Sequence, residues 1–365
     1  MKIALLGDIA LFGQMSVSSN PRLKEYFSDI AEYLNHFDYV VGNLETPFSV
    51  LKRTSGAKSA FICSDVENVV VLKQLHIHAV SLANNHMFDY GEEGYETTKK
   101  ILKENGIEYF GSEGKDLKIE QDGNRIAFSG FCCYSSGPLK CVPNGKYGVN
   151  AYNLGIVNEC MIRNENEGFL NILAVHAGKE HVNYPSIDHI RAARMLADNV
   201  DYVYYGHHPH VIQGVEEYKG SLIAHSLGNF CFDDIYTKAS GSKPLITLSE
   251  NNRHGVILEL TIERNKVVKW REQVVYISKG EKMKLLEKYD SIIEYNSILT
   301  NSEKDKQAYN DKRNAILVAR QVERKEERTL TWYLRRLRPM YLKLFLTSKR
   351  NIKNYNINVL NNIKK

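Results

Sequence analysis

The chain has 365 residues, of which 43% are hydrophobic and 25% are charged, and these values exclude wholesale disorder. The six cysteines form no C-x-x-C pair, which disfavours both a thiolate zinc site and a disulfide framework. The net charge of +5 is modest, and neither a base-stacking motif nor a recognition helix accompanies it, so nucleic acid is not expected as a partner.

Short apolar runs predict a series of strands. The first run, Lys2–Leu6, reads as a buried strand and not as a secretory signal, because Asp8 interrupts the apolar stretch. Several later runs are hydrophobic throughout, as expected of strands that are covered on both faces. The later predicted strands are Tyr39–Val41, Ala79–Ala83, Ile126–Phe131, Ile172–Val175, Tyr202–Tyr205 and Leu222–His225.

Segments of helical length lie between these runs, and the alternation predicts an α/β layered fold with much parallel pairing. Further along the chain, Gly255–Ile262 and Val267–Ile277 alternate in polarity around Arg264 and Asn265, which predicts an antiparallel hairpin. The predicted helices are Pro21–Phe37, Val66–Leu75, Tyr95–Asn105 and Asp188–Asn199.

The sequence becomes polar and rich in Lys, Glu and Arg near residue 280. We therefore predict one domain over residues 1–280 and a basic, mostly helical extension over residues 281–365. Two interpretations of the extension stay open: a basic amphipathic helix on an anionic membrane surface, or a helix packed on the main domain. Its apolar residues at helical spacing are Leu330, Tyr333, Leu334, Leu337, Tyr341, Leu344 and Phe345.

The location follows from the same features. No apolar run approaches the roughly 20 residues of a membrane-spanning helix. We expect a cytoplasmic protein without a signal peptide or transmembrane helix, peripheral at the inner face of the membrane if the extension binds lipid.

Side chains that can bind metal follow several predicted strands. In open α/β sheets, ligands collect at the carboxyl ends of the strands. A single polar residue after a strand is more often a turn former or a helix cap. Caps alone, however, do not explain histidines at three strand ends beside Asp, Glu and Asn. The candidate metal ligands are Asp8, Glu45, Asn85, His176, His208 and His210.

This set of donors indicates a particular class of metal. Carboxylate, amide and imidazole groups without thiolate suit Mn²⁺, Fe or Zn²⁺ better than Mg²⁺. The number of donors is sufficient for one or two divalent ions. A pair of ions about 4 Å apart clamps the attacking and leaving oxygens of a displacement reaction.

Residues 1 to about 277 resemble the CapA-type poly-γ-glutamate capsule biosynthesis proteins, a branch of the calcineurin-like metallophosphoesterase superfamily. The resemblance implies a sandwich of two β-sheets flanked by helices, with the site at one edge. Six motifs in chain order carry it: GDIALFG from Gly7, GNLETP from Gly42, SLANNHMFDYG from Ser81, VHAGKE from Val175, GHHPHVIQG from Gly206 and HSLGNFCFDD from His225.

The resemblance also implies roles for single residues. Asp8, Asn85 and His176 match metal ligands of the family, and His86 matches its catalytic imidazole, which polarises the substrate. In the last histidine motif, the His-x-His spacing is reproduced by a pair of residues that we favour over His207. This pair is His208 and His210.

The chain departs from the wider superfamily at two positions. The first motif of the superfamily is Asp-x-His, but the residue two positions after Asp8 is not a histidine. The second motif of the superfamily has a bridging aspartate, and here Glu45 stands one or two positions further along the chain. These departures leave one-ion and two-ion sites both open. Glu180 is a candidate base or replacement ligand, and its alternative is a solvated charge. Asn229 and Arg191 are candidates for binding an anionic substrate, with a turn residue and a surface charge as the alternatives.

The leading functional hypothesis is a metal-dependent hydrolase that makes or modifies a capsular or cell-surface polymer, either poly-γ-glutamate or a polysaccharide. Its substrate would be phosphorylated or γ-glutamyl. The alternative is a non-catalytic capsule assembly protein that retains the metal site and binds an anionic polymer. A third interpretation, a membrane-surface or capsule-assembly adaptor, depends on the C-terminal extension alone.

Overall fold

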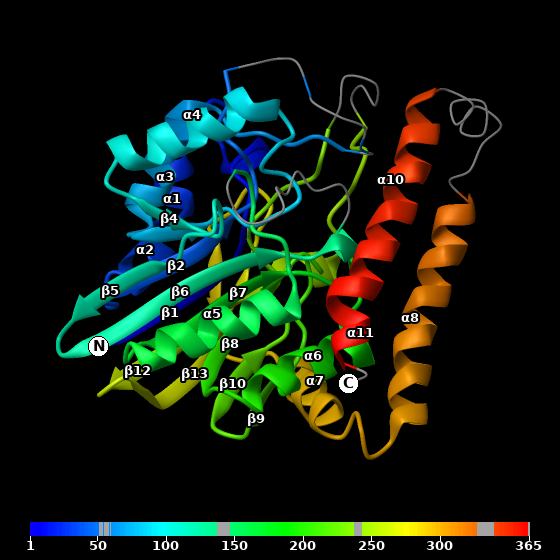
Figure 1. Ribbon diagram of the computed structural model, residues 1–365. Helices are drawn as coiled ribbons and strands as arrows, with labels where there is room; N and C mark the ends of the chain where they lie inside the picture. The colour runs from blue at the N-terminus through cyan, green and yellow to red at the C-terminus, as the bar shows by residue number, and fades with distance from the viewer. Residues whose placement is uncertain are drawn as a thin grey trace.

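The computed structural model describes residues 1–50, 54, 58, 60–136, 147–236, 243–326 and 339–363. These residues form two β-sheets that pack face to face, with helices on both outer faces (Figure 1). The predicted α/β sandwich of two central sheets with helices outside is confirmed.

The first sheet has eight strands, with the N-terminal strand β1 in its interior. Its order is β14-β13-β12-β1-β2-β3-β4, and the short β11 also pairs with β1. Strands β1 to β4 are parallel, whereas β12, β13 and β14 pair in antiparallel fashion. The strands are β1 (Lys2–Ile9), β2 (Tyr39–Leu44), β3 (Ala79–Ser81), β4 (Glu108–Phe110), β11 (Asn229–Cys231), β12 (His254–Glu263), β13 (Lys266–Tyr276) and β14 (Lys284–Leu286).

The second sheet has six strands in the order β5-β6-β7-β8-β10-β9. Its four middle strands are parallel, so their carboxyl ends share one edge of the sheet. The strands are β5 (Leu117–Gln121), β6 (Asn124–Cys132), β7 (Leu170–His176), β8 (Tyr202–His207), β9 (Val215–Tyr218) and β10 (Ser221–Ala224).

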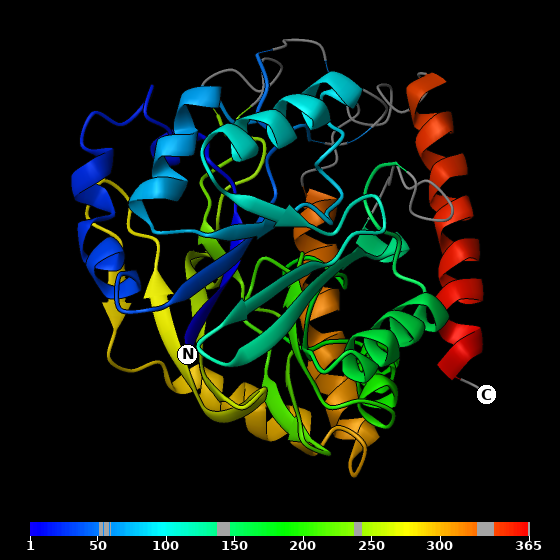
Figure 2. The ribbon, with the colours of Figure 1, turned by 60° about the vertical axis from the view of Figure 1, so that its left-hand side comes forward.

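Helices cover the two outer faces of the sandwich (Figure 2). On the first sheet lie α1 (Leu23–Tyr26), α2 (Ser28–Leu34), α3 (Val69–Gln74) and α4 (Gly91–Glu104). On the second sheet lie α5 (Leu154–Asn166) and α6 (Ile187–Ala197). Short 3-10 turns occur at Gly13–Met15, Val66–Asn68, Tyr134–Ser136 and Glu250–Arg253.

Alternation of side chains along the strands builds the core in three layers. In β1, Ile3 packs between the two sheets, whereas Ala4 packs under the helices of the first sheet. In β7, Ile172 joins the layer between the sheets and Leu173 joins the layer under α5 and α6. Because successive residues of a strand point to opposite faces, runs that are apolar throughout fill both layers.

The C-terminal region is helical, as predicted. It comprises α7 (Asp290–Thr300), α8 (Lys306–Glu326), α10 (Pro339–Tyr355), a π-helical turn (Asn356–Leu360) and α11 (Asn361–Ile363). Tyr295 and Tyr309 join the layer between the sheets, and Val359 joins the layer around α5 and α6. The extension therefore contacts the main body. Residues 330–338, which include much of the predicted amphipathic stretch, lie outside the described residues.

The predicted strands and the hairpin are present, with ends that differ by a few residues. Arg264 and Asn265 both adopt positive φ, at 51° and 61°, as a two-residue hairpin turn requires. The prediction of one helix over Pro21–Phe37 was wrong. The helix is interrupted at Phe27, which lies between α1 and α2, and the Phe27 ring is fully buried against that of Tyr26.

Candidate metal centre

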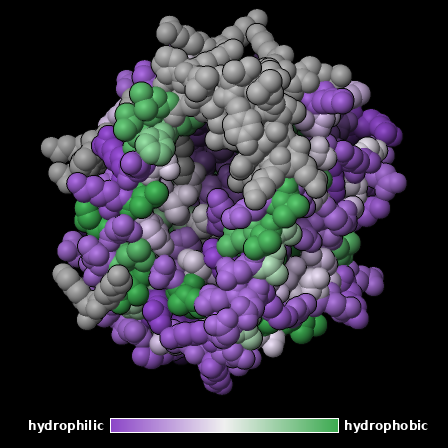
Figure 3. Space-filling model, turned by 90° about the vertical axis from the view of Figure 1, so that its right-hand side faces the viewer, coloured by the Kyte–Doolittle hydropathy of each residue, from purple (hydrophilic) through white to green (hydrophobic). Residues whose placement is uncertain are grey.

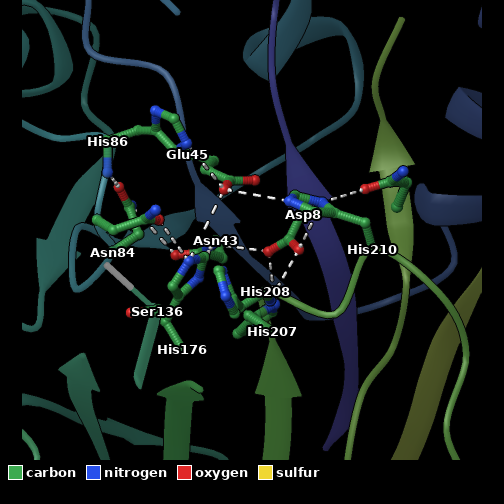
Figure 4. A network of polar contacts seen from close by, with 12 residues as sticks. Asp8, Asn43, Glu45, Asn84, His86, Ser136, His176, His207, His208 and His210 are labelled. Atoms are coloured by element: carbon green, nitrogen blue, oxygen red, sulfur yellow. Dashed lines mark hydrogen bonds and ion pairs between the residues drawn. The ribbon is translucent and has the colours of Figure 1, made fainter. Parts of the chain in front are cut away.

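The carboxyl ends of strands from both sheets bring the candidate residues together. In the first sheet, Asp8 of β1 lies between Asn43 of β2 and Asn229 of β11 in register. In the second sheet, His176 of β7 lies beside His207 of β8. These two rows meet where the edges of the sheets face one another, so residues far apart in sequence become neighbours (Figure 4).

Asp8 is fully buried and is surrounded by donors. Its Oδ1 accepts a hydrogen bond from Nδ2 of Asn43 at 2.8 Å, and its Oδ2 accepts one from the backbone N–H of His208 at 3.1 Å. Nδ1 of His207 lies 3.1 Å from Oδ1. Burial acts to raise the pKa of Asp8, but the hydrogen bond and charge of His207 and the other histidines outweigh it and lower the pKa. Asp8 is therefore ionised.

Glu45 follows β2 and carries a fully buried carboxylate, and neither of its oxygens has a hydrogen-bond partner within the described part of the chain. Its Oε1 lies 3.7 Å from Nε2 of His176, 3.7 Å from Nε2 of His210 and 4.0 Å from Nε2 of His86. Burial raises the pKa of Glu45 to about 8. An unpartnered carboxylate among imidazoles is costly unless a proton or a cation satisfies it.

The histidines divide by their surroundings. Burial lowers the pKa of His176 well below its ordinary value and lowers that of His208 to about 4. Both rings are therefore neutral at pH 7, which is the form that binds metal. Burial also acts to lower the pKa of His210, but nearby carboxylates, first that of Glu45, raise it. Nδ1 of His208 is buried and has no hydrogen-bond partner in the ranges that the structure describes.

Two of these histidines, in the loop after β8, have a strained backbone conformation. His208 has φ of 91° and His210 has φ of 56°, a region that residues with a side chain rarely adopt. Such strain persists only where surrounding contacts enforce it, and it clusters at functional sites. The enforcing contacts include Asp8 with the His208 backbone and Asn229 with the His210 ring.

His86 is oriented by two charged partners. Its Nδ1 lies 2.7 Å from Oδ2 of Asp89 and 3.1 Å from Nζ of Lys58. Lys58 also donates to Oδ1 of Asp89 at 2.6 Å and to the carbonyl of Asn85 at 2.6 Å. With Nδ1 engaged by the carboxylate, Nε2 of His86 faces the cluster and Glu45 (Figure 4).

The structure brings seven of the predicted residues into one cluster. Asn85 joins it through Oδ1, which lies 2.8 Å from Nε2 of His176. Glu180 lies beside the cluster and lines the adjacent cavity; burial acts to raise its pKa, but the charges of His208 and His210 lower it to about 2. The seven residues are Asp8, Glu45, Asn85, His86, His176, His208 and His210.

Two residues predicted to bind substrate have other contacts. The Asn229 side chain is fully buried: its Oδ1 lies 2.9 Å from Nδ1 of His210, and its Nδ2 donates to the carbonyl of Asn252 at 2.9 Å. Both groups are used, so Asn229 positions a histidine. Arg191 lies on α6 with a side chain that is 41% exposed and pairs with Glu303 at 3.4 Å. The geometry does not bring Arg191 to the cluster.

Sequence reasoning did not select several residues that contact the cluster. Asn43 sits in the GNLETP motif, and only the pairing of β1 with β2 reveals that it faces Asp8. Nδ1 of His207 lies 3.1 Å from Oδ1 of Asp8, although the His-x-His spacing favours His208 and His210. Asp89 follows His86 by three residues, the spacing of a single turn, and this spacing was the available signal. Lys58 carried no local signal.

The cluster fits a divalent cation. Asp8, Glu45 and His210 each offer a ligand atom, and the three atoms lie within 4.8 Å of one another. Three buried polar atoms, the two carboxylate oxygens of Glu45 and Nδ1 of His208, have no hydrogen-bond partner among the described residues. Carboxylate, amide and imidazole donors are the ligands of Mn²⁺, Fe and Zn²⁺ sites. The unpartnered buried atoms and the chemistry of the donor groups therefore both indicate a site for a divalent cation.

A cavity of 280 Å³ opens beside this cluster. Its polar lining includes Asn85, His86, Glu180 and His210, so the cluster forms one of its walls. Burial, followed by the charges of His210 and Arg320 of α8, lowers the pKa of the lining residue His181 to about 3. The cavity gives a ligand a place next to the candidate metal ligands.

Known proteins resemble about two thirds of the chain. Residues 2–234 match the sequence model of a family described as bacterial capsule synthesis protein PGA_cap. The capsule biosynthesis protein CapA of Bacillus anthracis is 30% identical over 255 residues, which are 66% of this chain and 62% of that protein. The PGA biosynthesis protein CapA of Bacillus subtilis (strain 168) is 29% identical over 251 residues, 66% of each chain. The chain thus spans less than two thirds of the Bacillus anthracis relative.

Solved structures give a weaker likeness. The NAD nucleotidase of Haemophilus influenzae has a TM-score of 0.43 at 14% identity, over 89% of this chain and 60% of that one. A 5'-nucleotidase of Candida albicans SC5314 has a TM-score of 0.42 at 11% identity, over 89% and 57%. Likeness at this level supports no conclusion about activity. The sequence match, by contrast, covers more than half of the chain and confirms the resemblance carried by the six motifs: the chain belongs to the bacterial capsule synthesis protein PGA_cap family.

Proposed function

We propose that the chain is a metal-dependent hydrolase that makes or modifies a capsular or cell-surface polymer, acting on a phosphoester or an amide bond. The observation that carries the proposal is the Glu45 carboxylate, which is fully buried, has no hydrogen-bond partner among the residues that the structure describes and lies 3.7 Å from two imidazole Nε2 atoms. A divalent cation satisfies such a carboxylate. The family membership supports the connection with a capsule.

Each residue of the cluster has a defined part in this proposal. Asp8, Glu45, Asn85, His176, His208 and His210 would hold one or two ions of Mn²⁺, Fe or Zn²⁺. A bound cation supplies Lewis-acid polarisation of a phosphoryl or carbonyl oxygen and activates water near neutral pH. His86, oriented by Asp89 and Lys58, presents Nε2 to the substrate and can move a proton there.

A second candidate function is the binding of an anionic polymer without catalysis. The observation that favours it is the residue two positions after Asp8, which is Ala10 and not a histidine. The side chain of Ala10 is a methyl group, so it offers no ligand atom to the cluster. A metal site that is poorer in histidine binds an anion without necessarily activating a nucleophile.

The first experiment measures bound metal in the purified protein. We expect Mn, Fe or Zn in the wild type and a loss of most of it in H208A/H210A. The matched control is H78A, because His78 directly precedes β3 and so lies at the opposite end of that strand from the cluster. A wild type without transition metal, or a double variant with undiminished metal, contradicts the proposal.

The same preparations separate catalysis from binding. Phosphoesters and γ-glutamyl amides are screened with Mn²⁺, and the wild type is compared with H86A. Turnover that falls in H86A while metal content stays constant supports the hydrolase. A wild type that contains metal but turns over no substrate of the panel favours the polymer-binding protein.

A further inference from the structure

The cavity beside the cluster has two chemically different sides. The polar side is formed by the cluster and its neighbours, among them His86 and Glu180. An apolar wall adjoins it and comes from three separate parts of the chain. Its members are Phe232, Ile235, Ile246, Leu248 and Leu344.

The apolar wall is continuous with the metal cluster. The Phe232 ring, which follows β11, packs edge-on against the His210 ring at 4.9 Å between centroids. The backbone N–H of Ile235 donates to the carbonyl of Ile246 at 2.8 Å, and that of Leu248 donates to Oδ1 of Asp234 at 2.8 Å. These bonds hold the segments after β11 and before β12 together, so the wall begins directly beside a candidate metal ligand.

The last member of the wall comes from the C-terminal extension. Leu344 lies on α10, is partly buried and lines the cavity, whereas Leu342 and Phe345 on the same helix are 62% and 55% exposed. Figure 3 shows the side of the molecule that carries α8 and α10, where apolar residues form patches among hydrophilic ones. Leu344 lies far beyond residues 2–234, which match the family.

An apolar wall selects the ligand that covers it. Contact with an apolar group removes water from both surfaces and favours binding, whereas a charged group there loses its hydration without a partner. We propose that the substrate carries an aliphatic or aromatic group directly next to the group held at the metal centre, with Leu344 as a specificity-determining residue. This inference depends on the proposed metal site.

A series of n-alkylphosphonates from methyl to hexyl tests the inference. The phosphonate group probes the metal centre, and the alkyl chain probes the wall. Calorimetric titration of the full-length, Mn²⁺-loaded protein should show affinity rising about fourfold per added methylene until the wall is covered. In L344D the loss of affinity should be about tenfold larger for hexylphosphonate than for methylphosphonate, because the added carboxylate repels both phosphonates whereas only the hexyl chain loses its apolar contact. L342D on the exposed side of α10 is the matched control and should behave like the wild type.

The outcomes separate the two proposals. An affinity that does not change with chain length in the wild type overturns the apolar subsite, and this measurement requires no variant to fold. An equal effect of L344D and L342D on hexylphosphonate overturns the role of Leu344. Failure of every member to bind, methylphosphonate included, overturns the metal-centre function and the subsite with it.

Discussion

The amide of Asn229 fixes the His210 ring at the edge of the cluster. Its Oδ1 lies 2.9 Å from Nδ1 of His210, which leaves Nε2 of the same ring facing Glu45. Partners of this kind orient metal-binding histidines, and their loss typically costs 10- to 100-fold in metal affinity. We expect N229A to stay folded and to bind Mn²⁺ about 10- to 100-fold more weakly, as measured by competition with a chelator.

The control for this prediction is N199A. Asn199 also uses its amide to bond a neighbouring asparagine and a carbonyl, but it does so on the exposed surface after α6. N199A should leave Mn²⁺ affinity unchanged. Wild-type affinity in N229A would show that the protein matrix alone holds the His210 ring.

At the scale of single residues, the sequence locates strand ends but not strand neighbours. Asp8 and His176 stand directly after or at the ends of apolar runs, which makes them visible without a structure. The position of Asn43 beside Asp8 depends on the pairing of β1 with β2, which no local pattern encodes. The pairing of Arg191 with Glu303 could not be predicted for a similar reason, because the direction in which a helical residue points depends on how the helix packs.

At the scale of elements, a buried ion pair joins α6 to β9. Nη2 of Arg194 lies 2.5 Å from Oε2 of Glu216, and Nε2 of His225 lies 3.4 Å from Oε1. Burial acts to raise the pKa of Glu216, but hydrogen bonds from His225 and Arg194 outweigh it and hold the pKa below the ordinary value of 4.5. A lowered pKa means that Glu216 contributes stability above pH 4.5, and that this stability is lost as the pH falls through the folded-state value.

Replacement of Glu216 should therefore have a pH-dependent effect. E216Q leaves Arg194 buried without its partner, which costs about 3 to 5 kcal/mol of unfolding free energy at pH 7. The difference from the wild type should shrink below pH 4.5, because residue 216 then becomes neutral in both proteins. Urea unfolding between pH 3 and pH 7 measures it, with E217Q on the exposed side of β9 as the control. A difference that is constant with pH would contradict the prediction.

Secondary-structure elements differ in how well they can be predicted from their own sequences. The β12–β13 hairpin was predicted because its strands alternate around a two-residue turn that tolerates positive φ. Helix α5 was missed, although Asn153 caps it by accepting hydrogen bonds from the N–H groups of Gly155 and Ile156. A cap of this type is a weak signal alone, because asparagine is equally common in turns.

At the scale of the whole molecule, the helices after residue 280 share the hydrophobic core of the family region. Tyr295 and Leu299 of α7 are 9% and 1% exposed and pack with the residues between the two sheets. Nδ2 of Asn296 donates to Glu272 of β13, and Oδ1 of Asn296 accepts from the backbone N–H of Val215 in β9. The predicted boundary near residue 280 is a change of sequence character, and the apolar packing runs across it.

The shared core leads to a prediction about cooperativity. If α7 belongs to the same folding unit as β9, peptides from the two elements should exchange their protected amide hydrogens with the same opening free energy and the same dependence on urea. Y309A should lower both free energies equally, by about 3 to 5 kcal/mol, because it removes a buried ring and its hydrogen bond to the Pro185 carbonyl. V318A is the control, since Val318 lies on the same helix and is 59% exposed. The prediction is contradicted if α7 opens at a lower free energy than β9 and if Y309A leaves the opening free energy of the β9 peptides unchanged. The extension would then be a separately folding unit, and the change in sequence character near residue 280 would mark a true domain boundary.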